Sequence, residues 1–262
     1  MLIDVANPAS FPQEAIKNIE LTFRNLPDSV KNELYKREIK HDSEAVSILE
    51  SLFSPSNPGA SELYDNLDFI FNKHDFLCYH ATRITHTTEF DKEGLREFSW
   101  NRYEKNLSQF FHEKGLDENA VGEVMDLIRH EEERKYASPG HPHRTCFFTP
   151  FSNICSSNDR LGYDQFIENI GGEIARFALR DKMPEVFSLL KSNGKPVVVK
   201  VSVEYRRISE WDKRRILYHF IIATLSRIIW NYNYDLGMDF SVNGDIGPNN
   251  ILDEIYLDNP DK

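Results

Sequence analysis

The chain has 262 residues, of which 40% are hydrophobic and 12% aromatic, and its formal net charge is −11. This length allows one large domain with or without a helical extension, and the composition is that of a folded protein. The acidic balance excludes the overall basic footprint of a duplex DNA binder. Five cations between residues 206 and 215 could form a local basic patch or a solvated helix start.

Cysteine usage and hydropathy indicate the compartment. The three cysteines, Cys78, Cys146 and Cys155, have no paired spacing, which favours a reducing environment over a disulfide framework. No basic region followed by an apolar run marks a signal peptide. The most apolar window, residues 216–230, contains His219 and Arg227 and is shorter than the roughly 20 apolar residues of a membrane span. We therefore expect a cytoplasmic protein without a membrane partner.

Residues 1–74 are predicted to be helical. Apolar residues recur at helical spacing after Pro12, after Asp28, over 43–53 and over 61–73, and a Pro- and Gly-containing break separates the last two segments. No catalytic constellation is visible in this part. We expect a helical N-terminal extension that caps the remainder of the chain or binds a regulatory partner such as an antitoxin or a chaperone.

The stretch from Phe76 to Glu97 predicts a buried strand followed by a short helix. The strand is formed by Phe76 to Tyr79, and His80, Ala81, Thr82 and Arg83 are expected at its tip. The helix is predicted to stop at Gly94, a glycine suited to the position after a helix end. A strand that ends in His, Thr and Arg can present these groups and backbone amides to a ligand. Alternatively, His80 is a core histidine with its hydrogen bonds satisfied.

The remaining elements alternate between helices and strands. Helices are predicted over 102–114, 117–136 and 212–232, and strands over 145–151, 196–203 and 251–257. Two His-Glu pairs, at 112 and 130, lack the second histidine four residues on that a zinc protease helix needs, since Leu116 and Arg134 stand there. We therefore predict no metal.

Gly171-Gly172-Glu173 interrupts a predicted helix that begins near Tyr163. Two glycines cost a helix about 1 kcal/mol each relative to alanine, which is tolerated where the backbone passes close to another group. Glu173 would then be held in a tight place. The alternative is a turn between two helices with an exposed glutamate.

Three stretches together resemble the ADP-ribosyltransferase fold in its histidine-bearing branch. They are Tyr79-His80-Ala81-Thr82 with the helix and Gly94-Leu95 that follow, Phe147-Phe148-Thr149, and Gly171-Gly172-Glu173. The turn Pro248-Asn249-Asn250-Ile251 resembles a late turn of the same family. The resemblance covers residues 76–257. It implies an α+β fold with a split β-sheet core, a catalytic domain over 75–262, and NAD as the substrate.

The resemblance also implies roles for these residues. Glu173 would stabilise the oxocarbenium character that develops when the nicotinamide glycosidic bond breaks, and would bond the ribose 2′-hydroxyl. His80 would hold the adenosine-side ribose, and Arg83 would meet the pyrophosphate. The nicotinamide would stack on Tyr79 or Phe148. Ala81, Thr82 and Thr149 complete the expected NAD-binding set.

The implied function is NAD-dependent ADP-ribosyl transfer to a macromolecule, RNA or protein, as in bacterial toxins and antiphage effectors. The residue two positions before Glu173 is glycine, where family members that modify arginine have Gln or Glu, so the acceptor is left open. Two alternatives remain. One is an inactive member of the fold that only binds, and the other is an enzyme similar to RNA 2′-phosphotransferases.

Overall fold

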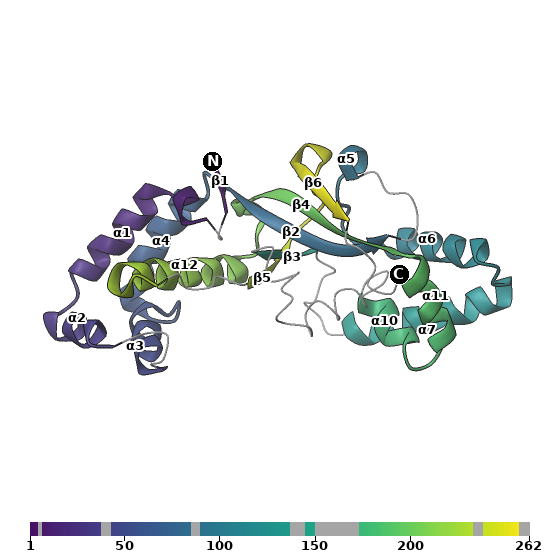
Figure 1. Ribbon diagram of the computed structural model, residues 1–262, viewed down its shortest axis with the longest axis horizontal. Helices are drawn as coiled ribbons and strands as arrows, with labels where there is room; N and C mark the ends of the chain where they lie inside the picture. The colour runs from purple at the N-terminus through teal and green to yellow at the C-terminus, as the bar shows by residue number, and fades with distance from the viewer. Residues whose placement is uncertain are drawn as a thin grey trace. The chain divides into compact units, whose positions relative to one another are not determined.

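The computed structural model is a mixed α+β protein (Figure 1). It describes residues 1–4, 7–37, 43–84, 90–136, 145–149, 173–232 and 238–256. The helices are α1 (Gln13–Arg24), α2 (Asp28–Tyr35), α3 (Ser43–Phe53), α4 (Ser61–Phe71), α5 (Phe90–Glu93), α6 (Trp100–Glu113), α7 (Glu118–Tyr136), α10 (Glu173–Leu179), α11 (Pro184–Asn193) and α12 (Glu210–Trp230). The strands are β1 (Leu2–Ile3), β2 (Asp75–Ile84), β3 (Thr145–Thr149), β4 (Lys195–Glu204), β5 (Met238–Val242) and β6 (Ile251–Tyr256).

The strands form one sheet in the order β5-β3-β2-β4-β6, with β1 parallel to β2. β3 is antiparallel to β2, and β6 is antiparallel to β4 with a register shift between Lys200 and Val201. Val197, Val198 and Val199 are fully buried in succession, so β4 is covered on both faces there. This burial explains why the β-branched run predicted a strand from sequence alone.

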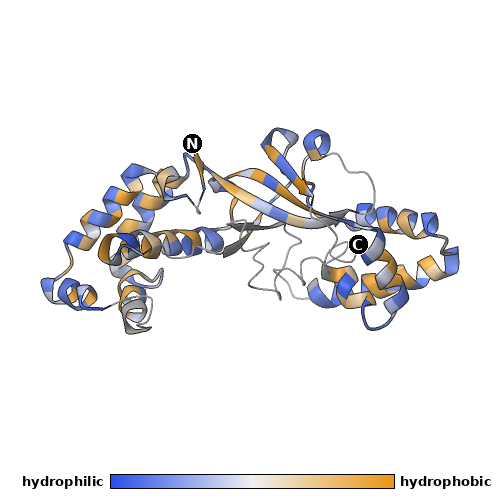
Figure 2. Ribbon diagram, in the orientation of Figure 1, coloured by the Kyte–Doolittle hydropathy of each residue, from blue (hydrophilic) through white to orange (hydrophobic). Residues whose placement is uncertain are grey.

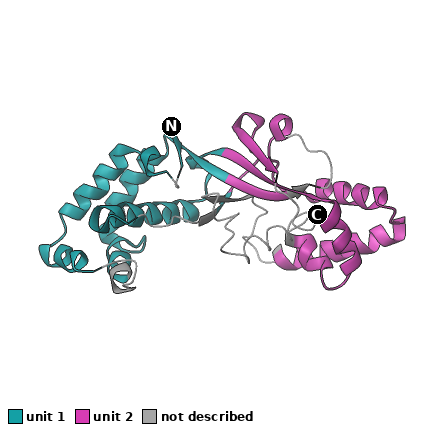
Figure 3. Cartoon of the chain, in the orientation of Figure 1, with its two compact units in different colours: residues 1–78, 202–241 teal, residues 79–201, 242–262 magenta. Residues whose placement is uncertain are grey.

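The chain divides into two compact units, shown in Figure 3. Unit 1 contains residues 1–78 and 202–241, and unit 2 contains residues 79–201 and 242–262. This division differs from the expected one of 1–74 and 75–262, because α12 belongs with the N-terminal helices. The boundaries fall inside β2, β4 and β5.

Unit 1 is built around α12, which contacts α1, α2, α3 and α4. Every residue from 220 to 226 is buried, as expected for a helix covered on all sides. Figure 2 shows the hydropathy of each residue along α12. The Phe220 ring lies 4.8 Å from that of Phe11 and 4.9 Å from that of Phe71. Phe71 also packs on Phe76 and Tyr205. Removing the N-terminal helices would therefore expose the core of unit 1, so they are not a detachable extension.

Unit 2 contains a helical core made by α6, α7, α10 and α11. Its buried residues include Phe111, Val124, Ile128, Ala175 and Leu190. Helix α10 packs mainly on α7 and also on α11. Among the described helices of both units, none is long and apolar enough to cross a membrane.

Elsewhere in unit 2, backbone hydrogen bonds join the segment after α5 to the segment before β6. Leu95 and Ile246 exchange backbone hydrogen bonds of 2.9 and 2.7 Å. Gly94, with φ of 73°, ends α5 as the sequence predicts. Asp245 accepts from the Glu97 N–H at 2.6 Å and from Arg96 Nη1 at 2.9 Å.

This Asp245 contact predicts an acid-sensitive contribution to stability. The Glu97 N–H, followed by the Arg96 side chain, holds the pKa of Asp245 below its ordinary value of 3.8. Because the folded pKa is the lower one, the stabilisation is complete above the unfolded pKa and is lost as the pH falls through the folded pKa. We expect Asp245→Asn to lower the urea midpoint at neutral pH, and expect this difference to shrink below pH 3.8. A difference that is constant with pH would contradict the assignment.

Candidate functional site

The residues predicted to bind NAD lie on β2, but within the strand and not at its tip. β2 continues through His80, Ala81, Thr82 and Arg83 and ends at Ile84. The expectation of a strand end at Tyr79 was therefore wrong. It followed the apolar run alone, whereas β-branched Thr82 and Ile84 also favour extended backbone.

Burial along β2 changes at His80. The positions from Phe76 to Tyr79 are all buried, and Tyr79 is 8% exposed. His80, Ala81 and Thr82 are half-buried. The covered part of the strand therefore ends where the predicted ligand-binding residues begin, and His80 can meet both a ligand and its own protein neighbours.

The structure brings two of the predicted residues together across β2 and β3. Tyr79 and Phe148 are opposite each other in the antiparallel pair. Directly opposed positions in such a pair lie on the same face of the sheet. Thr149 follows Phe148 as the last residue of β3. The strand register therefore sets these two predicted positions opposite each other.

Glu173 is the first described residue of α10. The residues after it, Ile174, Ala175 and Ala178, are buried in the core that α10 shares with α7. Gly171 and Gly172 lie outside the described residues. The interpretation of Gly-Gly-Glu as a turn between two helices therefore stays a prediction. The structure thus joins Tyr79 and Phe148, and fixes Glu173 only by its place on α10.

Cys78, beside the predicted site residues, is unsuited to nucleophilic chemistry. Its side chain is fully buried and its thiol lies 3.4 Å from the Phe76 carbonyl oxygen. Burial raises the pKa of the thiol well above its ordinary value. Since the thiolate is the reactive form, Cys78 serves as a small core residue.

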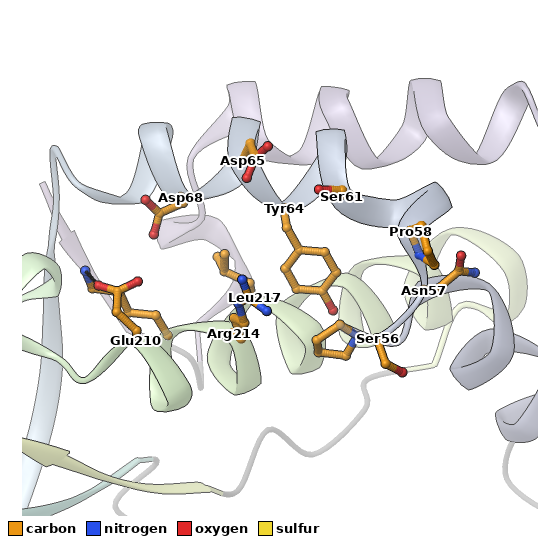
Figure 4. Close-up of a pocket in the computed structure, with 12 residues that line it drawn as sticks. Ser56, Asn57, Pro58, Ser61, Tyr64, Asp65, Asp68, Glu210, Arg214 and Leu217 are labelled. Atoms are coloured by element: carbon orange, nitrogen blue, oxygen red, sulfur yellow. Dashed lines mark hydrogen bonds and ion pairs between the residues drawn. The ribbon is translucent and has the colours of Figure 1, made fainter.

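A second group of polar residues, which the sequence interpretation missed, lines a pocket within unit 1. Asp65 and Asp68 of α4 lie opposite Glu210 and Arg214 of α12 (Figure 4). Lys213 also lines the pocket. The volume of the pocket is about 240 Å³. The sequence did contain one indication of this polar group: Asp65 and Asp68 are three residues apart, which places them on the same face of a predicted helix.

The same region determines the role of the cationic run from 206 to 215. Lys213 is 7% exposed, and Arg206 is paired with Glu204 at 2.9 Å. Arg215 stacks on Trp211, with 5.3 Å between its guanidinium carbon and the ring centroid. These three cations are engaged by their neighbours, which disfavours the basic-patch interpretation.

The geometry defines a mixed α+β protein with one predicted site on β2 and β3 and a polar pocket in unit 1. Comparison with known proteins identifies no relative: no protein-family model, curated protein or solved structure matches the chain. Functional inference therefore depends on the residues themselves.

Proposed function

We propose that the chain is an NAD-dependent ADP-ribosyltransferase whose site is formed around β2 and β3. The observation that supports this proposal most is the antiparallel register that sets Tyr79 opposite Phe148. The family resemblance assigns one or the other of these two aromatic positions to the nicotinamide. His80 and Thr82, two further positions that the resemblance assigns to NAD, follow Tyr79 on the half-buried part of the strand.

In the proposed reaction the bond between the nicotinamide nitrogen and ribose C1′ breaks. Nicotinamide leaves with the bonding electrons and becomes neutral. The nucleophile of the acceptor then forms a bond to C1′ and loses its proton. The Glu173 carboxylate stabilises the positive charge that develops on the ribose. The acceptor is a macromolecule, RNA or protein, and the proposed biological context is that of a bacterial toxin or antiphage effector acting in the cytoplasm.

The direct test is release of nicotinamide from NAD by the purified full-length chain. NAD labelled on the adenosine side and added to a cell lysate then identifies the acceptor, because the label enters either the protein or the nucleic acid fraction. Absence of nicotinamide release in both the purified protein and the lysate would overturn the transferase proposal.

A second candidate is an NAD-binding module without transfer activity. The observation in its favour is that Glu173 lies on a helix packed on α7, and no contact of this helix with β2 or β3 is among the larger contacts of the described elements. NAD affinity without nicotinamide release would identify this case.

We predict that His80→Ala weakens NAD binding and lowers turnover, each by about 10-fold or more, since the imidazole is assigned to positioning a ribose. Calorimetric NAD affinity and the rate of nicotinamide release are the two measurements. His112→Ala, which removes an imidazole from the exposed surface of α6, is the matched control. Unchanged NAD affinity in His80→Ala would identify His80 as a structural histidine.

A further inference from the structure

The pocket of about 240 Å³ in unit 1 is a candidate ligand site that is independent of the proposed function. Its walls come from α4, α12 and the turn over residues 55–58, all within one compact unit. The pocket is smaller than the roughly 300–1,000 Å³ that holds a drug-sized ligand. It therefore suits a small metabolite.

Lys213 supplies the first indication of what the pocket binds. Its side chain is 9% exposed, and its ammonium lies 2.7 Å from Glu210 Oε1. Among the described residues, Glu210 is its only hydrogen-bond acceptor, and the Tyr205 ring centroid lies 5.4 Å from Nζ. An ammonium has three donors, so a buried one with a single acceptor leaves N–H groups available for oxygens inside the pocket.

Asp65 and Arg214 supply the second indication. They line the pocket from α4 and α12, and Figure 4 shows them on opposite sides of it. Neither has an ion pair or side-chain hydrogen bond to another residue in the part of the chain that the structure describes. Asp68, one turn from Asp65, accepts from Asn72 Nδ2 at 2.8 Å through its Oδ2. Asp65 and Arg214 are both exposed, so their charges are at the solvent-accessible edge of the pocket. A ligand with two charged ends could contact an anion on α4 and a cation on α12 at the same time.

We propose that this pocket binds a free α-amino acid, with its carboxylate on Lys213 and Arg214 and its ammonium on Asp65 and Asp68. The balance of charge selects this class over a phosphorylated metabolite. The lining holds one more carboxylate than cation, so a doubly negative phosphate would add to an existing negative excess. An amino acid whose net charge is zero or positive instead offers a carboxylate to the cations on α12 and an ammonium to the aspartates on α4.

The experiment uses the full-length chain and the twenty common L-amino acids, each at about 10 mM, with inorganic phosphate as a separate probe. At about 100-fold over Kd a ligand stabilises the folded state by about 2.7 kcal/mol, which a thermal unfolding screen detects. Calorimetry then gives the affinity for the amino acid with the largest shift. Asp65→Asn and Arg214→Gln are each expected to weaken that affinity about 10-fold or more, because each removes a hydrogen bond between charged groups.

Matched controls lie on the same two helices. Glu62→Gln on α4 and Arg227→Gln on α12 remove the same charges at exposed positions outside the pocket lining, and should leave the affinity unchanged. Three results would overturn the proposal: no amino acid shifts the unfolding temperature, phosphate alone binds, or the control variants weaken binding as much as the pocket variants. Nicotinamide release is not a readout here, so this test and that of the transferase can fail separately.

Discussion

Replacing Glu173 with glutamine is expected to slow nicotinamide release from NAD by about 100-fold or more while leaving NAD affinity nearly unchanged. Glutamine keeps the size and hydrogen-bonding capacity of the side chain but removes the negative charge. That charge is assigned to a state in which the ribose becomes positive, so its loss raises the barrier by about 2.7 kcal/mol. Steady-state nicotinamide release and calorimetric NAD binding are the paired measurements.

The structure supplies a matched control for this substitution. Glu185 lies in the first turn of α11, so Glu185→Gln removes a carboxylate from another helix of unit 2. Loss of the favourable dipole interaction should lower the stability of Glu185→Gln by about 0.3–1 kcal/mol. Only Glu173→Gln should lose activity. Wild-type release rates in Glu173→Gln would remove Glu173 from the mechanism.

Elements with a strong local pattern were predicted well from sequence. The valine run around Val198 predicted β4, and the apolar face of 216–230 predicted α12. Gly94 is confirmed as the residue that ends α5. In each case the residues that form the element also carry its signal, through β-branching, helical spacing or a glycine with positive φ.

Features set by distant partners were not predictable in the same way. β1 has only two residues, and pairing with β2 defines it as a strand. The compact unit that contains the N-terminal helices also includes α12, more than a hundred positions later in the chain. The apolar face of α12 was visible in the sequence, but nothing in its spacing names the helices that cover it.

The candidate site shows the same limit. The residue types at positions 79 to 83 and 148 to 149 indicated a ligand, but the opposition of Tyr79 and Phe148 depends on the register of two strands far apart in the chain. The pocket in unit 1 was missed because Lys213 lies in a run of cations that is typical of solvated surface. Its burial follows from the packing of α12 against α4, which no local pattern encodes.

Gly94→Ala is expected to destabilise the chain by about 3 kcal/mol or more. Two costs add at this position. The φ of 73° is strained for any residue with a Cβ, and a Cβ built there would overlap the Ile246 carbonyl oxygen. That oxygen accepts the Leu95 N–H and belongs to backbone, so it cannot move aside without breaking the pairing of Leu95 with Ile246. Urea unfolding, followed by a probe of unit 2, measures the effect.

Substituting two other glycines of unit 2 distinguishes the cost of the positive φ from the cost of the close approach to Ile246. Gly115 has φ of 88°, and a Cβ added there would meet no atom within 4 Å, so Gly115→Ala carries only the backbone cost, about 1–2 kcal/mol. Gly122 lies inside α7 with open space around it, and Gly122→Ala should stabilise by about 0.5–1 kcal/mol. Equal losses in Gly94→Ala and Gly115→Ala would mean that the close approach to Ile246 adds nothing. A larger loss at Gly94 assigns the difference to that approach, and so measures how firmly the segment after α5 is joined to the segment before β6.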